Sequence, residues 1–261
     1  METPSRALAF DRNLGWIAIG VAAVLATYTV AATWERVKIR PPERSLRITG
    51  SAKKRIASDL IEWTCYVEAR NPTDRTAAYK ALHGHVALVL EFLQKQGIKP
   101  DEIRPSAARV QEMKEVEHVI ERIGKDENRV ERELFKGYRA DQSVTVRSKD
   151  LARIERASRE VTQLLERGVS VSSAAPSYYY SKLGEMKLEM LAEAARNART
   201  RADNILTSAG GATIRQLRSA DMGIINVNAA DSTETSAQGN NDTTSVEKDI
   251  ITIVHVVYDL K

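Results

Sequence analysis

Residues 14–33 form an uncharged, mostly apolar run near the start of this sequence. About 20 apolar residues make a helix long enough to cross the ~30 Å hydrocarbon core of a bilayer. Aromatic side chains favour the headgroup layer, so we expect Trp16, Tyr28 and Trp34 to lie near the membrane interfaces. The predicted parts of the chain are a short tail (residues 1–13), a transmembrane anchor (residues 14–34), a linker (residues 35–45) and a charged, folded domain (residues 46–261).

A signal peptide is the alternative interpretation of this apolar run. A cleavable signal has an apolar region of about 7–15 residues and a cleavage site of small residues. Val30-Ala31-Ala32 provides such a site, but the run is long for a signal and an aromatic residue closes it. The sequence therefore favours a retained anchor, and an uncleaved or cleaved signal remains the alternative.

A basic cluster follows the apolar run. Its members are Arg36, Lys38, Arg40, Arg44 and Arg47. We expect Arg36, Lys38 and Arg40 to lie at the membrane surface, where basic residues either contact anionic headgroups or only fix the topology. Taken alone, this charge predicts that the domain stays in the cytoplasm, although the rule weakens where a long domain follows.

Charge and cysteine content exclude several classes of site. The chain has 39 Lys and Arg against 35 Asp and Glu, a formal net charge of +4, and the two signs are interleaved. This pattern is typical of a solvated surface and does not indicate nucleic-acid binding. Cys65 is the only cysteine, which excludes an intramolecular disulfide and a zinc site built from cysteines.

No motif for catalysis or cofactor binding is present: the sequence has no nucleophile elbow, phosphate-binding loop or dinucleotide fingerprint. His83 and His85 are two residues apart in a predicted helix, so their rings point in nearly opposite directions. His255 lies among apolar residues of a predicted strand, and we expect it in the core. We therefore expect no catalytic residue, no cofactor and no metal, with an enzyme as a minor alternative.

The first half of the domain has alternating strand and helix patterns. Apolar alternation predicts a strand over residues 61–69 with Cys65 facing inward. Asn71-Pro72-Thr73-Asp74 opens a helix with a capping side chain and a proline whose missing N–H costs nothing there, and Gly97 is placed to end it. Its predicted buried face consists of Leu82, Val86, Val89, Leu90 and Leu93.

A long β-hairpin follows, with arms at residues 116–123 and 130–147 and a turn at residues 124–128. Charges crowd its outer part, so we expect the tip to project into solvent. The next helix is predicted to be capped by Ser148 and ended by Gly168. Its predicted inward residues are Leu151, Ile154, Val161, Leu164 and Leu165.

The second half contains the best-defined helix, over residues 183–209, with an alanine-rich stripe. The stripe consists of Leu188, Leu191, Ala195, Ala198, Ala202, Ile205 and Ala209. Two strands near residues 213–220 and 223–228, a long flexible loop (residues 229–247) and a central strand (residues 250–260) follow. The predicted class is α+β: a transmembrane helix, then a mixed domain with antiparallel sheets, a long hairpin and about three helices.

Three consecutive tyrosines, Tyr178, Tyr179 and Tyr180, stand at the end of a predicted strand that starts at residues 169–171. In a strand, Tyr178 and Tyr180 share one face and Tyr179 takes the other. One interpretation is ordinary core packing. The other is an oligomer interface or a ligand platform, because exposed tyrosines favour interfaces.

Residues 137–146 match the pattern Gly-Tyr-x-Ala-x-x-x-Val-x-Val, and an alanine-rich helix over residues 192–211 closes with Gly210. With Ile48-Thr49-Gly50 and Asp59 near the start, these segments make the chain resemble the SIMPL-domain family of bacterial periplasmic and envelope proteins. The resemblance covers roughly residues 46–261. It departs at Ala52, where the family usually has glycine, and in the segment before the last strand.

The resemblance implies a location outside the cytoplasmic membrane, and hence a single-pass inner-membrane protein with a periplasmic domain. It also implies self-assembly, because some members form ring- or channel-like oligomers, and it brings no catalytic residues. The first hypothesis is a non-enzymatic homo-oligomeric envelope protein. The alternative is a small-molecule or partner-binding module, connected with stress, with residues 229–247 as a lid. The expected partners are the chain itself, the bilayer through residues 14–34, and other envelope proteins.

Overall fold

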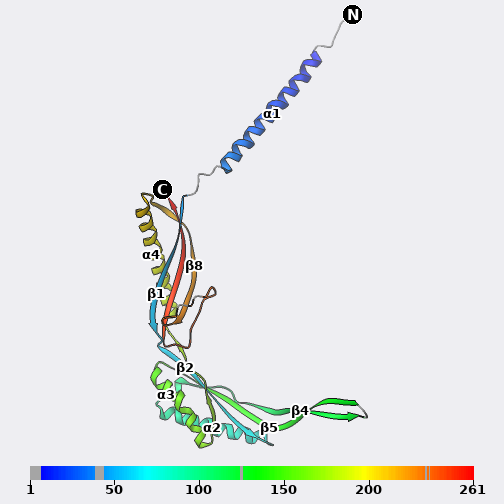
Figure 1. Ribbon diagram of the computed structural model, residues 1–261, viewed down its shortest axis with the longest axis vertical. Coiled ribbons are helices and arrows are strands. Elements are labelled where there is room, and N and C mark those ends of the chain that lie inside the picture. The colour runs from blue at the N-terminus through cyan, green and yellow to red at the C-terminus, as the bar shows by residue number, and fades with distance from the viewer. Residues whose placement is uncertain (1–6, 39–43, 124–125, 233, 235) are drawn as a thin grey trace. The chain divides into compact units, whose positions relative to one another are not determined.

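The computed structural model describes the chain apart from residues 1–6, 39–43, 124–125, 233 and 235; side chains at 7–15, 36–38, 119–123 and 126–130 are also left undescribed. The described elements (Figure 1) are α1 (Ala7–Lys38), β1 (Ser45–Ala57), β2 (Leu60–Asn71), α2 (Arg75–Lys95), η1 (Pro100–Glu102), β3 (Ile103–Pro105), β4 (Arg109–Ile123), β5 (Asp126–Ser148), α3 (Leu151–Glu160), η2 (Val161–Arg167), β6 (Ser170–Ser173), β7 (Ser177–Tyr179), α4 (Leu183–Ala209), β8 (Ile214–Ala229) and β9 (Glu247–Leu260). The predicted α+β class is confirmed.

These elements form two compact units, which are described separately. Unit 1 comprises Met1–Ile48, Ala202–Ala220 and Val256–Lys261. Unit 2 comprises Thr49–Arg201 and Asp221–His255.

The core of unit 2 lies on an antiparallel sheet in which β2 is paired with β5 on one side and with β6 and β7 on the other. Helices α2 and α3 pack on this sheet. The alternation predicted for residues 61–69 is confirmed, and Cys65 is fully buried beside Trp63. The buried face of α2 is also confirmed, except that Leu90 is half-buried. Asp74 caps α2 by accepting a hydrogen bond from the Thr76 amide at 2.7 Å.

The cap of α3 differs from the prediction. Asp150, and not Ser148, is the N-cap, and its carboxylate accepts from the Arg153 amide at 3.1 Å. Ser148 instead donates its hydroxyl to Glu102. The helix passes at Glu160 into the tighter η2, which ends at Gly168 as predicted, with a φ of 77°. This change of pitch turns Leu165 outward, so that it is 54% exposed and its predicted burial is wrong.

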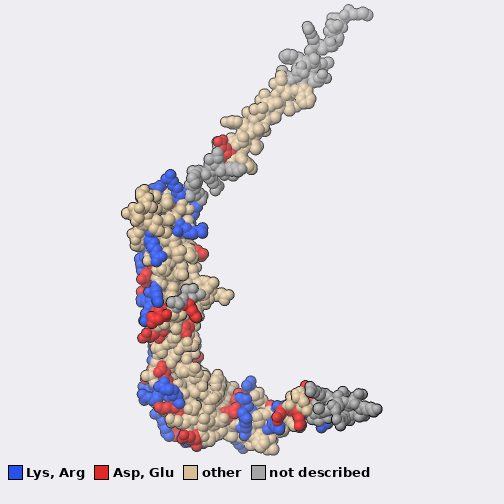
Figure 2. Space-filling model, in the orientation of Figure 1, with Lys and Arg blue, Asp and Glu red and all other residues tan. Residues whose placement is uncertain are grey.

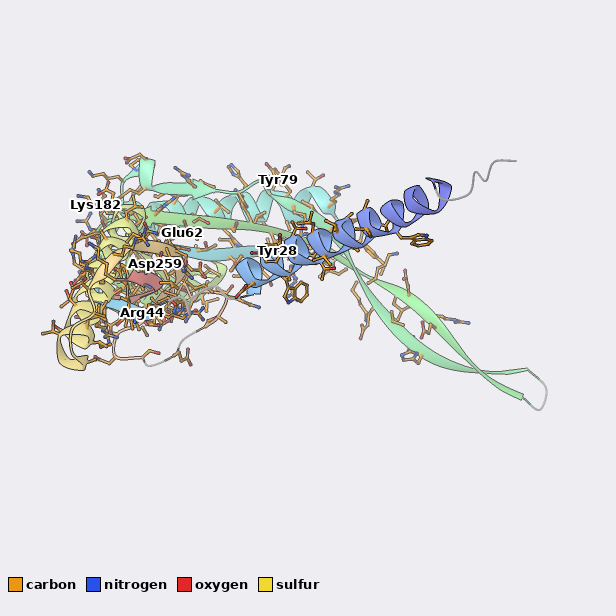
Figure 3. All side chains as sticks on the ribbon, turned by 90° about the horizontal axis from the view of Figure 1, so that it is seen from above. Tyr28, Arg44, Glu62, Tyr79, Lys182 and Asp259 are labelled. Atoms are coloured by element: carbon orange, nitrogen blue, oxygen red, sulfur yellow. The ribbon has the colours of Figure 1, made fainter. Side chains whose placement is uncertain are left out.

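The β4–β5 hairpin is longer than predicted. Its pairing continues to Ile123 opposite Asp126, so the predicted turn at 124–128 is wrong for residues 126–128, while 124–125 lie outside the described residues. Strand β2 pairs with β5 only at residues 138–148. Beyond that point, the hairpin is a ribbon of two strands (Figure 3), and a β-bulge between Met113 and Lys114 marks its base.

The second sheet has the order β1-β9-β8, which confirms the central position of the last strand. The two strands predicted between residues 213 and 228 form one continuous strand, β8, so their separation is wrong. The predicted strand leading to the tyrosines is instead divided into β6 and β7 by residues 174–176.

Helix α4 has the predicted bounds but turns a different face inward. The buried residues are Met190, Ala194, Ala198, Ala202 and Leu206. Leu188 and Ile205 are 71% and 46% exposed, and Ala195 and Ala209 are also exposed, so the predicted stripe is wrong at these positions. Small residues face the sheet because Gly50 of β1 lies directly against the backbone of Ala194 and the side chain of Ala198.

The predicted loop after β8 is held along that strand by side-chain amides. Asn226 accepts from the Ser236 amide, and Asn228 accepts from the side chain of Asn240 at 2.9 Å. His255 is exposed, and its Nδ1 lies 3.1 Å from the Thr49 hydroxyl, so its predicted burial in the core is wrong. His255 stands on the face of β9 opposite to the one on which Val254 and Val256 are buried.

Candidate functional site

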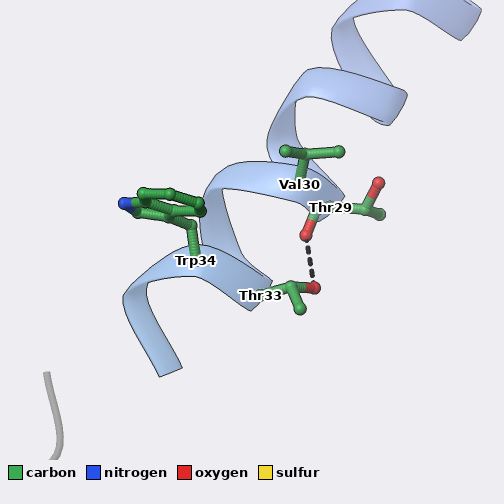
Figure 4. A pocket seen from close by; sticks show the side chains of 4 residues that line it. All are labelled: Thr29, Val30, Thr33 and Trp34. Atoms are coloured by element: carbon green, nitrogen blue, oxygen red, sulfur yellow. Dashed lines mark hydrogen bonds between the residues drawn. The ribbon is translucent and has the colours of Figure 1, made fainter. Parts of the chain in front are cut away.

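Helix α1 carries the apolar run. Its Trp16–Glu35 segment, 20 residues long, is long and apolar enough to cross a membrane. A signal sequence near the N-terminus meets the same criteria of length and composition. The hydroxyls of Thr27, Thr29 and Thr33 each donate to a carbonyl oxygen three or four residues earlier. Figure 4 shows the bond from Thr33 to the Thr29 carbonyl, at 2.7 Å. Because these hydroxyls have partners within the helix, they stay hydrogen-bonded in lipid.

The predicted interfacial aromatic residues lie on this helix. Trp16, Tyr28 and Trp34 are 70%, 71% and 64% exposed. At 1.5 Å per residue, Trp16 and Trp34 are about 27 Å apart along the helix, close to the thickness of a hydrocarbon core. Tyr28 lies about 9 Å before Trp34 along the helix, and its interfacial position stays a prediction.

The predicted basic residues follow the apolar segment of α1 in the sequence. Arg36 and Lys38 belong to its last turn, whereas Arg40 lies outside the described residues. The helix thus extends beyond the predicted anchor at both ends, from Ala7 to Lys38.

The three tyrosines are half-buried in unit 2. Tyr178 packs against the core, and its hydroxyl donates to Glu155 of α3 at 2.9 Å. Burial, followed by this hydrogen bond, raises the pKa of Tyr178. Tyr179 and Tyr180 line a small cavity of about 50 Å³. The cluster therefore serves packing at Tyr178, while its predicted interface role remains a prediction.

The small cavity beside the tyrosines also contacts a buried charge pair. The Lys248 side chain is 2% exposed, and its Nζ donates to the Asp242 carbonyl and lies 3.3 Å from the Asp242 carboxylate. Burial opposes ionisation of Asp242, but hydrogen bonds from Thr244 and Ser245 together with Lys248 hold its pKa below the usual range. Small-molecule sites occupy about 300–1,000 Å³, so this cavity is too small to be one, and the pair fixes the loop after β8.

A second buried carboxylate belongs to Asp249 of β9, which is 1% exposed. It accepts from Arg55 Nε at 3.0 Å and from the Asp231 amide at 2.9 Å, and Lys53 Nζ lies 3.0 Å away. The Arg55 hydrogen bond, opposed by burial, holds the pKa of Asp249 below its usual range. This cluster joins β1, β9 and the loop, and we assign it a structural role.

A polar hollow of about 270 Å³ lies on the sheet of unit 2 at the base of the hairpin. Asp141 of β5 stands between Glu68 of β2 and Arg109 of β4 in the strand register. Arg139 Nε is 3.2 Å from Glu68 Oε2 and 4.0 Å from Asp141 Oδ1. Arg139 Nε and Asp141 Oδ1 are buried and have no hydrogen-bond partner in the structure. The hollow thus presents a donor and an acceptor that take part in ion pairs but make no well-aligned hydrogen bond. We refer to it as the base hollow.

The hairpin ribbon exposes apolar side chains beyond the last pairing with β2. Val116 and Phe135 are each 50% exposed and share one face, and Leu134, 39% exposed, lies on the other. The rings of Phe135 and Tyr138 form a T-shaped pair with centroids 5.2 Å apart, and Tyr138 packs against the core. An apolar stripe therefore continues from the core onto the ribbon, which we call the hairpin stripe (Tyr138, Phe135 and Val116).

Cys65, His83 and His85 lie in different environments. Burial raises the pKa of the Cys65 thiol to about 12, so the thiolate is scarce at neutral pH. His83 is exposed, and His85 Nδ1 lies 3.1 Å from the Glu68 carbonyl oxygen. Within the described part of the chain, no three His, Cys, Asp or Glu side chains gather as a metal site.

Reasoning from the sequence missed the base hollow and the hairpin stripe. Glu68 belongs to the predicted strand over residues 61–69, and Arg139 and Asp141 belong to the predicted hairpin arm over residues 130–147, but only the register of the strands shows that they adjoin. Val116 and Phe135 looked like ordinary members of a hairpin, and only the end of the β2 pairing shows that no third strand of the described residues adjoins them.

The comparison with known families covers nearly all of the folded domain. A family model matches residues 46–258, and its description is SIMPL, a protein of unknown function (DUF541). No curated protein matches the chain. Since the match spans most of the chain and confirms the resemblance carried by Gly50, Gly137 and the alanine-rich helix, this protein belongs to the SIMPL family.

Proposed function

We propose that this protein is a non-enzymatic, membrane-anchored envelope protein that assembles into a homo-oligomer through its hairpin. The observation that carries the proposal is the hairpin stripe, which leaves Val116 and Phe135 half-exposed on a ribbon of two strands. Two-stranded ribbons are marginally stable alone in water, and exposed apolar groups mark interaction sites. Contact with another copy would cover the stripe and support the ribbon.

The anchor supports assembly in a second way. A domain tethered by α1 is confined to a layer beside the membrane, which raises the effective concentration of neighbouring copies. The family resemblance favours a periplasmic domain, since long domains translocate largely regardless of the charges that flank the span. We therefore propose a single-pass inner-membrane protein with the SIMPL domain outside, the anchor being retained.

The mass of the full-length protein in mild detergent, measured by light scattering, tests the assembly. We expect a defined oligomer for the natural sequence. Replacing Val116 with threonine and Phe135 with serine keeps the strand pattern and removes the apolar stripe, so the particle mass should fall at least twofold. The matched control is Leu165→Ser, which removes a similarly exposed apolar side chain from η2 and should leave the mass unchanged. A monomeric natural protein, or an oligomer that survives the double substitution, contradicts the proposal.

The base hollow favours a second candidate function, binding of a small polar ligand. Arg139 Nε and Asp141 Oδ1 lie 4.0 Å apart and make no hydrogen bond in the structure, although Glu68 Oε2 is 3.2 Å from Arg139 Nε. A buried polar group without a hydrogen bond costs about 1–3 kcal/mol. A ligand with an amide and both charges, such as a dipeptide, would satisfy both atoms beside Glu68 and Arg109. We place the ligand of the binding-module hypothesis in the base hollow, because the cavity near the tyrosines is too small for a ligand covered by residues 229–247.

Titration of the full-length protein with alanyl-alanine, followed by NMR, tests this candidate. We expect shifts of the amide signals around Tyr66 and Asp141, and their loss in Asp141→Asn, which no longer offers a charged acceptor. The control Glu91→Gln removes an exposed carboxylate from α2 and should keep the shifts. Absence of shifts at millimolar dipeptide excludes this class of ligand.

A further inference from the structure

The folded part of unit 1 outside α1 is basic. It contains five basic and two acidic residues, a net charge of +3. The basic residues, all exposed, are Arg44, Arg47, Arg215, Arg218 and Lys261. One of the acids, Asp259, accepts from Arg218 Nε at 2.6 Å. The acidic residues of these segments therefore neutralise only part of the positive charge.

Backbone hydrogen bonds bring the basic residues to one end of the β1-β9-β8 sheet. The Leu260 amide donates to the Arg44 carbonyl, and the Lys261 amide donates to the Thr213 carbonyl, each at 2.8 Å. Arg44 and Lys261 lie at these bonds, and Arg215 is two residues from one of them. At about 3.3 Å per strand residue, the other two arginines are within ~10–16 Å of this end. Figure 2 shows Lys and Arg side chains gathered there, and Figure 3 labels Arg44 and Asp259. We call this region the proximal end.

The chain length between α1 and the proximal end limits how far the two separate. Lys38 is the last residue of α1, and Arg44 is six residues later. Six residues span at most about 22 Å when fully extended. If α1 crosses a bilayer, the proximal end therefore stays within reach of the headgroups at that surface.

The proximal end also carries exposed apolar side chains. Leu217 of β8 is 56% exposed and Ile205 of α4 is 46% exposed, and both belong to unit 1. Surfaces that combine basic and apolar side chains bind at the boundary of anionic headgroups and acyl chains. The chemistry of this end is thus complementary to an anionic lipid surface.

We propose that the proximal end docks on the anionic headgroups of the membrane that α1 crosses. This inference rests on the proposed anchor. The basic residues next to the span and those brought there from β8 and β9 then form one lipid-binding surface, although they are far apart in the sequence. Docking restricts the orientation of the domain on the membrane, which the tether alone does not.

A fluorescent probe at Leu217 tests the docking. The full-length variant Leu217→Cys is labelled with the polarity-sensitive dye NBD, because buried Cys65, with a pKa of about 12, does not compete. The protein is reconstituted in nanodiscs of phosphatidylcholine alone or with 30% phosphatidylglycerol. We expect a blue-shifted emission only with the anionic lipid, and its reversal by 0.5 M NaCl, which screens headgroup charge. The control Leu165→Cys, exposed to a similar degree in unit 2, should show no shift.

Two further results separate this proposal from the anchor. Replacing Arg47 and Arg215 with glutamate should abolish the shift while the protein still co-elutes with nanodiscs. An aqueous spectrum of the Leu217 probe in both lipids, with normal co-elution, overturns the docking and leaves the anchor standing. Failure to co-elute with nanodiscs overturns the anchor and the docking together.

Discussion

Replacing Gly50 with alanine is expected to lower the free energy of unfolding by about 3 kcal/mol or more, at the upper end of overpacking effects. A Cβ at this position would lie 2.2 Å from the Ala194 carbonyl oxygen and 2.6 Å from the Ala198 amide nitrogen and Cβ. These are mostly backbone atoms of α4, so no side chain can rotate away. The helix has to move off β1, which exposes the alanine-rich face that it buries.

Thermal unfolding of the full-length protein in detergent, followed by circular dichroism, measures this loss. A domain of this size loses about 2–4 °C per kcal/mol, so the midpoint should fall by about 6–12 °C. Gly84→Ala is the matched control, since nothing lies within 4 Å of its added Cβ in α2. Alanine there should stabilise the helix by about 0.5–1 kcal/mol. Equal midpoints for the two variants would contradict the close packing of α4 on β1.

Replacing Gly137 with alanine is expected to cost about 2–6 kcal/mol and to disrupt the proposed assembly. Gly137 has a φ of 112°, and such a conformation costs other residues about 1–3 kcal/mol. Its added Cβ would also lie 2.4 Å from the Asn71 carbonyl oxygen and 2.7 Å from Pro72 Cα, which adds about 1–3 kcal/mol. The residue stands where β5 leaves β2, so any shift there redirects the hairpin stripe.

Gly97→Ala separates the strain of the backbone from the steric clash. Gly97 has a φ of 78°, but the nearest atom to its added Cβ is 3.8 Å away in the Arg153 side chain. This variant should lose about 1–2 kcal/mol through backbone strain alone and keep its oligomeric mass. Denaturant unfolding and light scattering on both variants provide the comparison. A Gly137→Ala protein that is as stable as Gly97→Ala and still oligomeric would show that the hairpin base tolerates displacement.

Local patterns predicted much of this fold because they depend on neighbouring residues alone. The alternation around Cys65 and the helix that follows residues 71–74 are examples. The cap of α3 was misplaced because Ser148 and Asp150, two residues apart, are both good capping residues, and only the contact of Ser148 with Glu102 decides between them.

The inward face of α4 and the candidate sites depend on contacts between distant segments. Alanines occur on several sides of α4, so periodicity alone did not identify the face that meets Gly50, and it placed exposed Leu188 inside. The base hollow requires the register that sets Asp141 beside Glu68. Family resemblance did indicate Gly50 and Gly137, and the structure gives the steric reason for each.

The central position of β9 determines when its sheet can form during synthesis. Strands β1 and β8 flank β9, so they have no common neighbour until residues 247–260 have reached the compartment in which the domain folds. The six-stranded sheet around β2 uses only strands between residues 60 and 179, all of which are made before β8 and β9. Strand β1 is thus the first strand to be made and the last to gain its neighbour in the sheet. Its apolar face stays uncovered until almost the entire domain has been made. Non-local pairings of this kind fold slowly and expose apolar surface in the meantime, so the nascent chain is most vulnerable to aggregation at β1.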